Sequence, residues 1–216
     1  MAETDAPTTP RERYRAQVRT EIKDHAWAQI ATAGASALSL NAIAKQMGMS
    51  GPALYRYFAN RDELITALIR DAYRSLADTV QAAVESGADL AGLAHALRGW
   101  ALADPHRYLL IYGTPVPGYE APGDVTAIAG EIMAALLDAG AALASTGPAA
   151  PFDAYLAEQR QWARGHPAPP AAMRRALAFW TRLHGVLSLE LAGHFTGMGI
   201  DPTQLFAAEV DEIVTR

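Results

Sequence analysis

The sequence predicts an all-α protein, and three features of its 216 residues support that fold class. Half of the residues are hydrophobic, so a sizeable core can form. Apolar residues recur every three to four positions over long stretches, which is the period of an α-helix. Runs of β-branched residues with alternating polarity, which are typical of strands, do not stand out. We therefore expect an architecture of about nine to ten helices.

The first 33 residues divide into a polar tail and a helix. Residues 1–10 are rich in Pro, Thr and acidic residues, and we expect them to be disordered. A helix is expected from about Arg11 to Ala33, and Gly34 should end it. Its apolar positions recur every four residues, at Tyr14, Val18, Ile22, Ala26 and Ile30.

Two short helices joined by a tight turn are expected between Ser39 and Phe58. Ser39 can cap the first helix, and Ser50 can cap the second. Gly48 suits a left-handed backbone at the turn, and Pro52 falls in the first turn of the second helix, where a missing N–H costs little. The apolar side chains that should share one core are Ile43, Met47 and Leu54. This is the pattern of a helix-turn-helix, whose second helix enters a groove of DNA.

The rest of the chain is expected to be helical, with breaks rich in Gly and Pro. Asn60 can cap the first of these helices. They are expected over 61–85, 89–103, 105–112, 121 or 125–144, 152–164, 170–195, and from 201 to the C-terminus. We assign residues 11–60 to one domain and 61–216 to a second, linked by the helix over 61–85. The loops at 113–123 and 145–151 are long enough to suggest a role such as lining a pocket.

Charge is distributed unevenly along the chain. Residues 1–61 hold eight Lys and Arg against five acidic residues, whereas the whole chain has a net charge of −5. A basic head on an acidic body suits a protein that meets phosphates at one end. The sequence has no cysteine, no apolar segment of a signal sequence, and no stretch near the ~18 apolar residues of a membrane helix. A cytoplasmic protein without membrane contact is therefore expected.

Signatures of catalysis and metal binding are missing from the sequence. The P-loop, the GxGxxG pattern and the GxSxG nucleophile elbow do not occur. The six histidines form no His-x-x-x-His or Glu-x-x-His pair, although Glu190 and His194 are one helical turn apart. We expect no enzymatic activity, no cofactor and no metal site.

The hallmark strings of the motif are Tyr55-Arg56-Tyr57-Phe58 and Arg61-Asp62-Glu63-Leu64. Together with GASALSLNAIA and MGMSGPALYRYFANRDEL, they make residues ~11–75 resemble the DNA-binding domain of the TetR family of bacterial transcriptional regulators. The C-terminal half resembles a subset of that family through Trp180-x-x-x-His184-Gly185. The resemblance implies a homodimeric, ligand-responsive repressor of a palindromic double-stranded DNA operator. The alternatives are an activator of the same family, or a helical enzyme or ligand carrier with an incidental helix-turn-helix.

The resemblance assigns DNA contacts to residues of this motif. The base-facing residues would be Ser50, Gly51, Pro52 and Ala53. The phosphate-contacting residues would be Ser39, Lys45, Tyr57 and Arg61. Arg56 would contact either a base or a phosphate. Tyr55 is expected to pack in the domain core, with DNA contact as the alternative, and Arg11, Arg13 and Arg15 either reach DNA or lie in solvent.

The resemblance also places a ligand pocket and a dimer seam in the second domain. An apolar pocket for an unknown small apolar or aromatic ligand is expected, with ordinary core packing as the alternative for each residue. Its residues would be Trp100, Tyr108, Tyr112, Trp162, Phe179, Trp180 and His184. The last two long helices should pair with their two-fold mates in a four-helix seam. The apolar residues expected there are Leu183, Leu187, Leu191, Phe206, Val210 and Ile213.

Overall fold

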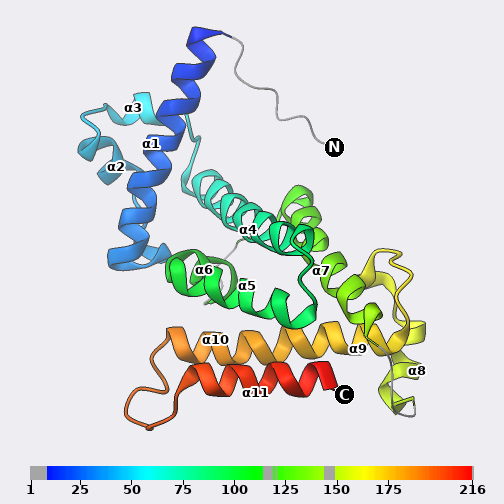
Figure 1. Ribbon diagram of the computed structural model, residues 1–216. Coiled ribbons are helices and arrows are strands. Elements are labelled where there is room, and N and C mark those ends of the chain that lie inside the picture. Colours follow the sequence, from blue (N-terminus) through cyan, green and yellow to red (C-terminus); the bar gives the residue numbers. More distant parts are fainter. Residues whose placement is uncertain (1–8, 114–118, 120, 144–148, 216) are drawn as a thin grey trace. The chain divides into compact units, whose positions relative to one another are not determined.

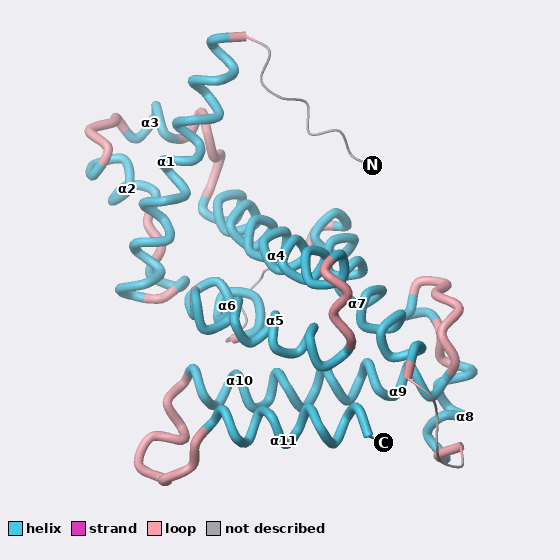
Figure 2. Tube along the Cα trace, in the orientation of Figure 1, coloured by secondary structure: helices cyan, strands magenta, loops and turns pink. Residues whose placement is uncertain are grey.

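The computed structural model describes residues 9–113, 119, 121–143 and 149–215. Every regular element within these ranges is a helix, as Figure 2 shows, which confirms the all-α fold class. The chain divides into two compact units, one with the described residues up to Arg70 and one with the helices from Asp71 onward. The division falls inside the continuous helix α4 (Arg61–Glu85), not at its start (Figure 1).

The first unit begins with a well-capped helix. It contains α1 (Pro10–Ala33), the 3₁₀ turn η1 (Ala35–Ala37), α2 (Leu40–Gln46), α3 (Gly51–Leu54) and the start of α4. The Thr9 hydroxyl accepts a hydrogen bond from the Glu12 N–H, and the Glu12 carboxylate accepts one from the Thr9 N–H. This capping box starts the helix at Pro10, within the predicted tail. Residues 1–8 of that tail lie outside the described residues.

The buried face of α1 confirms four of its five predicted apolar positions. Val18, Ile22, Ala26 and Ile30 are buried, whereas Tyr14 is 64% exposed. Burial of this face therefore begins one turn later than the sequence predicts.

The caps of the helix-turn-helix confirm two of three predictions. Ser39 accepts from the Ala42 N–H at 3.3 Å, and Asn60 accepts from the Glu63 N–H at 2.8 Å. Ser50 makes no side-chain cap bond. The N–H at the usual capping position, that of Ala53, donates to the Ser50 backbone carbonyl instead, at 2.9 Å. Gly48 has φ 65°, the left-handed conformation predicted for the turn.

The second helix of the motif is shorter than predicted. It ends at Leu54 and continues as a turn through Tyr57, rather than as a helix to Phe58. The Tyr57 N–H donates to the Leu54 carbonyl at 2.8 Å, which tightens the backbone after the helix. Phe58 is fully buried beside this turn, as expected for a core residue.

The second unit contains the end of α4 and seven further α-helices. These are α5 (Leu90–Ala103), α6 (Pro105–Tyr112), α7 (Gly123–Ala142), α8 (Pro151–Glu158), α9 (Pro170–Ala178), α10 (His184–Leu191) and α11 (Pro202–Thr215), with the 3₁₀ turn η2 (Gln161–Ala163). A π-helical segment, η3 (Phe179–Leu183), joins α9 to α10. Figure 1 shows α10 and α11 side by side.

Two predicted helices are interrupted or shortened. The helix expected over 152–164 ends at Glu158, and Arg164 adopts a left-handed φ of 50° after the turn η2. The helix expected over 170–195 ends at Leu191, because Gly193 takes a left-handed φ of 76°.

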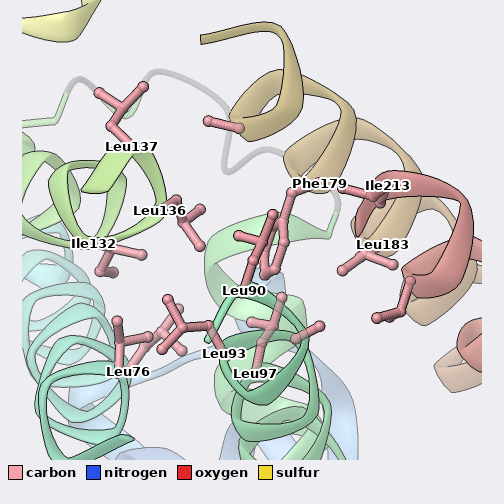
Figure 3. Close-up of a cluster of buried hydrophobic side chains, with 14 of the residues drawn as sticks. Leu76, Leu90, Leu93, Leu97, Ile132, Leu136, Leu137, Phe179, Leu183 and Ile213 are labelled. Carbon is pink, nitrogen blue, oxygen red and sulfur yellow. The ribbon is translucent and has the colours of Figure 1, made fainter. Parts of the chain in front are cut away.

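The core of the second unit centres on α5, which contacts α6, α7, α10 and α11. Figure 3 shows its leucines between those of α7 and the helix that follows α9. The labelled core residues are Leu76, Leu90, Leu93, Leu97, Ile132, Leu136, Leu137, Phe179, Leu183 and Ile213. Burying one such side chain is worth about 1.5–3 kcal/mol, so this cluster is the main source of the unit's stability.

Within the described part of the chain, one helix, α7, is long and apolar enough to cross a membrane by length and composition, contrary to the expectation from the sequence. It carries three carboxylates along its length, at Asp124, Glu131 and Asp138. Glu131 accepts two hydrogen bonds of 2.9 Å from Arg74 of α4. Its apolar residues pack in the core described above, so α7 is a core helix of this unit.

Candidate functional site

The helix-turn-helix exposes half of the ten residues predicted to meet DNA. Those exposed are Lys45, Ser50, Pro52, Tyr55 and Arg56, and the half-buried ones are Ser39, Gly51, Ala53, Tyr57 and Arg61. Tyr55 is 44% exposed, so its predicted packing in the core is wrong, and its ring is available to a ligand of this surface.

Two arginines of α1 hold the end of the second motif helix, a role that was not predicted from the sequence. Arg15 Nη2 donates to the Arg56 carbonyl at 3.2 Å, and Arg19 Nη1 donates to the Tyr57 carbonyl. The Arg19 guanidinium also lies 4.1 Å from the centroid of the Phe58 ring, a cation–π distance. Their spacing of four residues on α1 was the available signal. These contacts fix the orientation of the surface that carries Arg56.

The Arg61 side chain donates hydrogen bonds to backbone carbonyls of its own chain. Its Nη2 donates to the Ala35 carbonyl at 2.8 Å and to the Ser36 carbonyl at 3.3 Å, and its Nε donates to the Leu38 carbonyl at 3.2 Å. The side chain therefore anchors the turn before α2. Its contact with phosphate stays a prediction.

Ser39 is held in place by a side chain of α1. Its N–H donates to Gln29 Oε1 at 3.0 Å, so α1 positions the capped start of α2. A helix start with oriented N–H groups is a favourable place for a backbone phosphate.

A cluster of aromatic side chains and one histidine lies in the second unit. Tyr108 and Tyr112 of α6 meet Trp180 and His184 of the helix that follows α9. The Tyr108 hydroxyl is 3.0 Å from His184 Nδ1, 3.0 Å from Ser188 Oγ and 3.2 Å from the His184 carbonyl. The structure thus unites four of the seven predicted pocket residues, which we call the Tyr–His cluster.

The rings of the Tyr–His cluster are in direct contact. The Tyr112 and His184 ring centroids are 4.1 Å apart, and the Trp180 ring is 4.4 Å from that of His184. Tyr73 of α4 meets Tyr112 edge-on at 6.0 Å. Tyr73 and Ser188 were missed by the sequence analysis, although Ser188 lies one helical turn after His184 and its spacing was a usable signal.

Burial shifts the titration of this cluster. It lowers the pKa of His184 from 6.5 to about 4, because a charged imidazole would lose its hydration. It raises the pKa of Tyr112 well above 10, with smaller contributions from Tyr73 and Tyr108. Burial also raises the pKa of Tyr108, against a hydrogen bond from Ser188 that lowers it. All these groups are therefore uncharged near neutral pH.

The other three predicted pocket residues lie elsewhere in the second unit. Trp162 lines a separate surface cavity of about 240 Å³ beside α7. Phe179 is 2% exposed and packs against the α5 leucines in the hydrophobic core, as Figure 3 shows. Trp100 is buried and donates from Nε1 to Ser75 Oγ at 3.1 Å.

The predicted seam residues are not available to a partner chain. Five of the six are 5% exposed or less within the single chain, and Leu191 packs half-buried against the same core. These five are Leu183, Leu187, Phe206, Val210 and Ile213. The prediction that they form the dimer seam is wrong, because their apolar face is already covered by α5 and neighbouring helices.

A nearly buried ion pair joins α5 to α10. Arg98 Nη2 lies 2.6 Å from Glu190 Oε1, so Glu190 pairs across helices rather than with His194. Among the residues that the structure describes, no three His, Asp or Glu side chains come together in a way that could hold a metal ion.

An exposed helix-turn-helix, joined by one helix to a unit with a buried aromatic cluster, defines a DNA-binding transcriptional regulator. The description "Bacterial regulatory proteins, tetR family" applies to a sequence family that matches residues 22–68. A second family, "Tetracyclin repressor-like, C-terminal domain", matches residues 90–213. The chain belongs to the TetR family of transcriptional regulators, as its motif strings indicated.

Individual relatives agree with this assignment. The HTH-type transcriptional regulator Rv1816 of Mycobacterium tuberculosis is 37% identical, over 93% of this chain and 92% of the relative. The crystal structure of SCO4313, a protein assigned as regulatory, is 70% identical with a TM-score of 0.89, covering 96% of this chain and 100% of that one. FadR from Bacillus subtilis, solved with stearoyl-CoA, shares the fold at 15% identity with a TM-score of 0.55, over 91% of this chain and 97% of that one.

Proposed function

We propose that this regulator is a ligand-responsive repressor that binds a palindromic operator as a homodimer in the cytoplasm. The observation that carries the proposal is the Tyr–His cluster, a buried aromatic site in the unit that does not hold the helix-turn-helix. DNA binding by a regulator does not require such a site. Control of the regulator by a small molecule does require one. FadR, which shares the fold, holds stearoyl-CoA.

DNA binding is proposed to place α3 in the major groove. The two motifs of a dimer would meet half-sites about 34–36 Å apart on a palindrome. Direct reading of bases would be limited to Ser50, Tyr55 and Arg56, because Gly51, Pro52 and Ala53 have no polar side chain. Specificity would then depend also on DNA shape and on the spacing of the two half-sites.

The dimer is proposed to form through the outward faces of the last two long helices. On η3 and α10, Thr181, Gly185 and Leu189 are exposed, and Leu189 is 45% exposed. On α11, the exposed residues of the corresponding face include Gln204 and Ala208. The small residues among them, Thr181, Gly185 and Ala208, permit the close approach that a four-helix seam requires.

The proposal is tested by selecting bound sequences from a random DNA pool with the purified protein. A two-fold symmetric consensus, with one dimer per site in sedimentation, is the expected result. Absence of any enriched sequence would contradict it. A reporter fused to the selected operator then separates repression from activation, because expression falls in one case and rises in the other when the protein is present. Turnover of a bound compound without DNA binding would instead indicate an enzyme.

A further inference from the structure

Two polar atoms in the Tyr–His cluster are shielded from solvent and have no hydrogen-bond partner among the described residues. They are the Tyr112 hydroxyl oxygen and His184 Nε2. A buried polar atom without a partner costs free energy, and native proteins keep few of them. The neighbouring Tyr108 hydroxyl differs, because it contacts both His184 and Ser188.

The two atoms belong to one place in the unit. Their rings are in contact, at 4.1 Å between centroids, and Trp180 packs edge-on against both. The recorded ring neighbours of this pair are Tyr73, Tyr108 and Trp180, all of them uncharged. The site therefore offers two hydrogen-bonding atoms surrounded by aromatic surface.

The backbone at this place is also unusual. Trp180 lies inside the π-helical segment Phe179–Leu183, and His184 follows it directly. Such segments are rare and occur frequently at functional sites. Helix geometry and unpaired polar atoms are independent observations, and they coincide here.

The chemistry of the two atoms restricts what can satisfy them. A phenol hydroxyl both donates and accepts, and Nε2 of a neutral imidazole does one or the other according to its tautomer. A ligand hydroxyl, which also does both, satisfies either arrangement. A carboxylate or an ammonium group would bring a charge into this desolvated aromatic surrounding, which is costly without a partner.

We infer that the Tyr112 hydroxyl and His184 Nε2 form the polar end of the ligand site, and that the ligand is an uncharged apolar or aromatic molecule bearing a hydroxyl group. The inference rests on the proposed function for the existence of a ligand, and it adds the chemical class. Tyr73 and Trp180 would cover the ring or chain that carries the hydroxyl.

The first test compares two variants that each remove one hydroxyl from α6. Tyr108→Phe should lower the melting temperature of the ligand-free protein, because it leaves the partners on His184 and Ser188 unpaired. Tyr112→Phe should leave the melting temperature unchanged or raise it, because its hydroxyl has no partner to lose. If Tyr112→Phe lowers the melting temperature as much as Tyr108→Phe does, the Tyr112 hydroxyl has a structural role and the inference is overturned.

The second test measures probe affinities of the full-length protein near neutral pH by calorimetry. The probes are 2-naphthol, naphthalene and 2-naphthoate, which share a ring system and differ in the polar group. We expect 2-naphthol to bind about tenfold more tightly than either of the others. Tyr112→Phe should weaken the affinity for 2-naphthol about tenfold and leave the affinity for naphthalene unchanged. Tyr155→Phe on α8, whose side chain is exposed, is the matched control and should change nothing.

Three results would overturn the inference. They are preferred or equal binding of 2-naphthoate, an equal effect of Tyr112→Phe on 2-naphthol and naphthalene, and no binding of any probe up to its solubility limit. None of these measurements contains DNA. A failure of the proposed function, which appears as absent operator binding, is therefore distinguishable from a failure of this inference.

Discussion

Acidification should destabilise this protein through His184 in a calculable way. The folded-state pKa of about 4 lies below the ordinary value of 6.5, so protonation favours the unfolded chain. This destabilisation of the folded state is absent above pH ~6.5, grows as the pH falls from ~6.5 to ~4, and is constant below that range. The full loss for this difference in pKa is about 3 kcal/mol, and about 2 kcal/mol of it is reached near pH 5. The titratable groups that face His184, Tyr108 and Tyr112, stay neutral throughout because burial raises their pKa values.

The measurement is thermal unfolding of the wild type and His184→Asn near pH 8 and near pH 5, at fixed salt and protein concentration. Asparagine keeps a polar group where Nδ1 contacts Tyr108 and cannot be protonated in this range. For a chain of this size, about 2 kcal/mol corresponds to roughly 4–8 °C. Between pH 8 and pH 5, the melting temperature of the wild type should therefore fall by about 4–8 °C more than that of the variant. The other five histidines are common to both proteins, so equal losses in both would refute the reasoning.

Three further predictions concern the motif and the proposed dimer face. Arg19→Met should destabilise the first unit by about 1–2 kcal/mol in urea unfolding, because the Tyr57 carbonyl and the Phe58 ring lose their contacts with the guanidinium. It should also weaken binding to every DNA sequence. Unchanged stability would contradict the positioning role of Arg19. Arg56→Ala should lower the slope of log affinity against log salt by about one if the side chain contacts phosphate, and relax preference at one base pair if it contacts a base; an unaltered affinity for the selected operator would remove Arg56 from the interface. Leu189→Glu should yield folded monomers in sedimentation, and an intact dimer would mean that another face forms the seam.

Local signals in the sequence predicted the helices and most of their ends. The four-residue period of α1, the caps at Ser39 and Asn60, and the left-handed Gly48 all depend on neighbours within one turn, so they could be predicted without the fold. The missing cap at Ser50 is an exception, because Ala53 has an N–H at the usual capping position and donates it to the Ser50 carbonyl instead.

Long-range packing could not be predicted in the same way. An apolar period identifies which face of a helix is buried, but not whether its own chain or a partner covers it. The assignment of Phe206 and Leu187 to a dimer seam was wrong for that reason. The contact of Tyr112 with Tyr73, and the place of Trp162 in a separate cavity, depend on how α4, α6 and α7 pack. The π-helical segment also left no mark on the apolar period.

The segment Phe179–Leu183 gives the penultimate helix one residue more than a regular α-helix of the same span would need. Each residue turns an α-helix by about 100°, so losing a residue inside α9 would rotate the whole of α10 and carry His184 out of the core. Losing one inside the segment, such as the exposed Thr181, would convert it to regular helix and leave the orientation of α10 nearly unchanged. Natural variation in length should therefore be tolerated at this single point of the helix, beside the proposed ligand site and on the same backbone as the proposed dimer face.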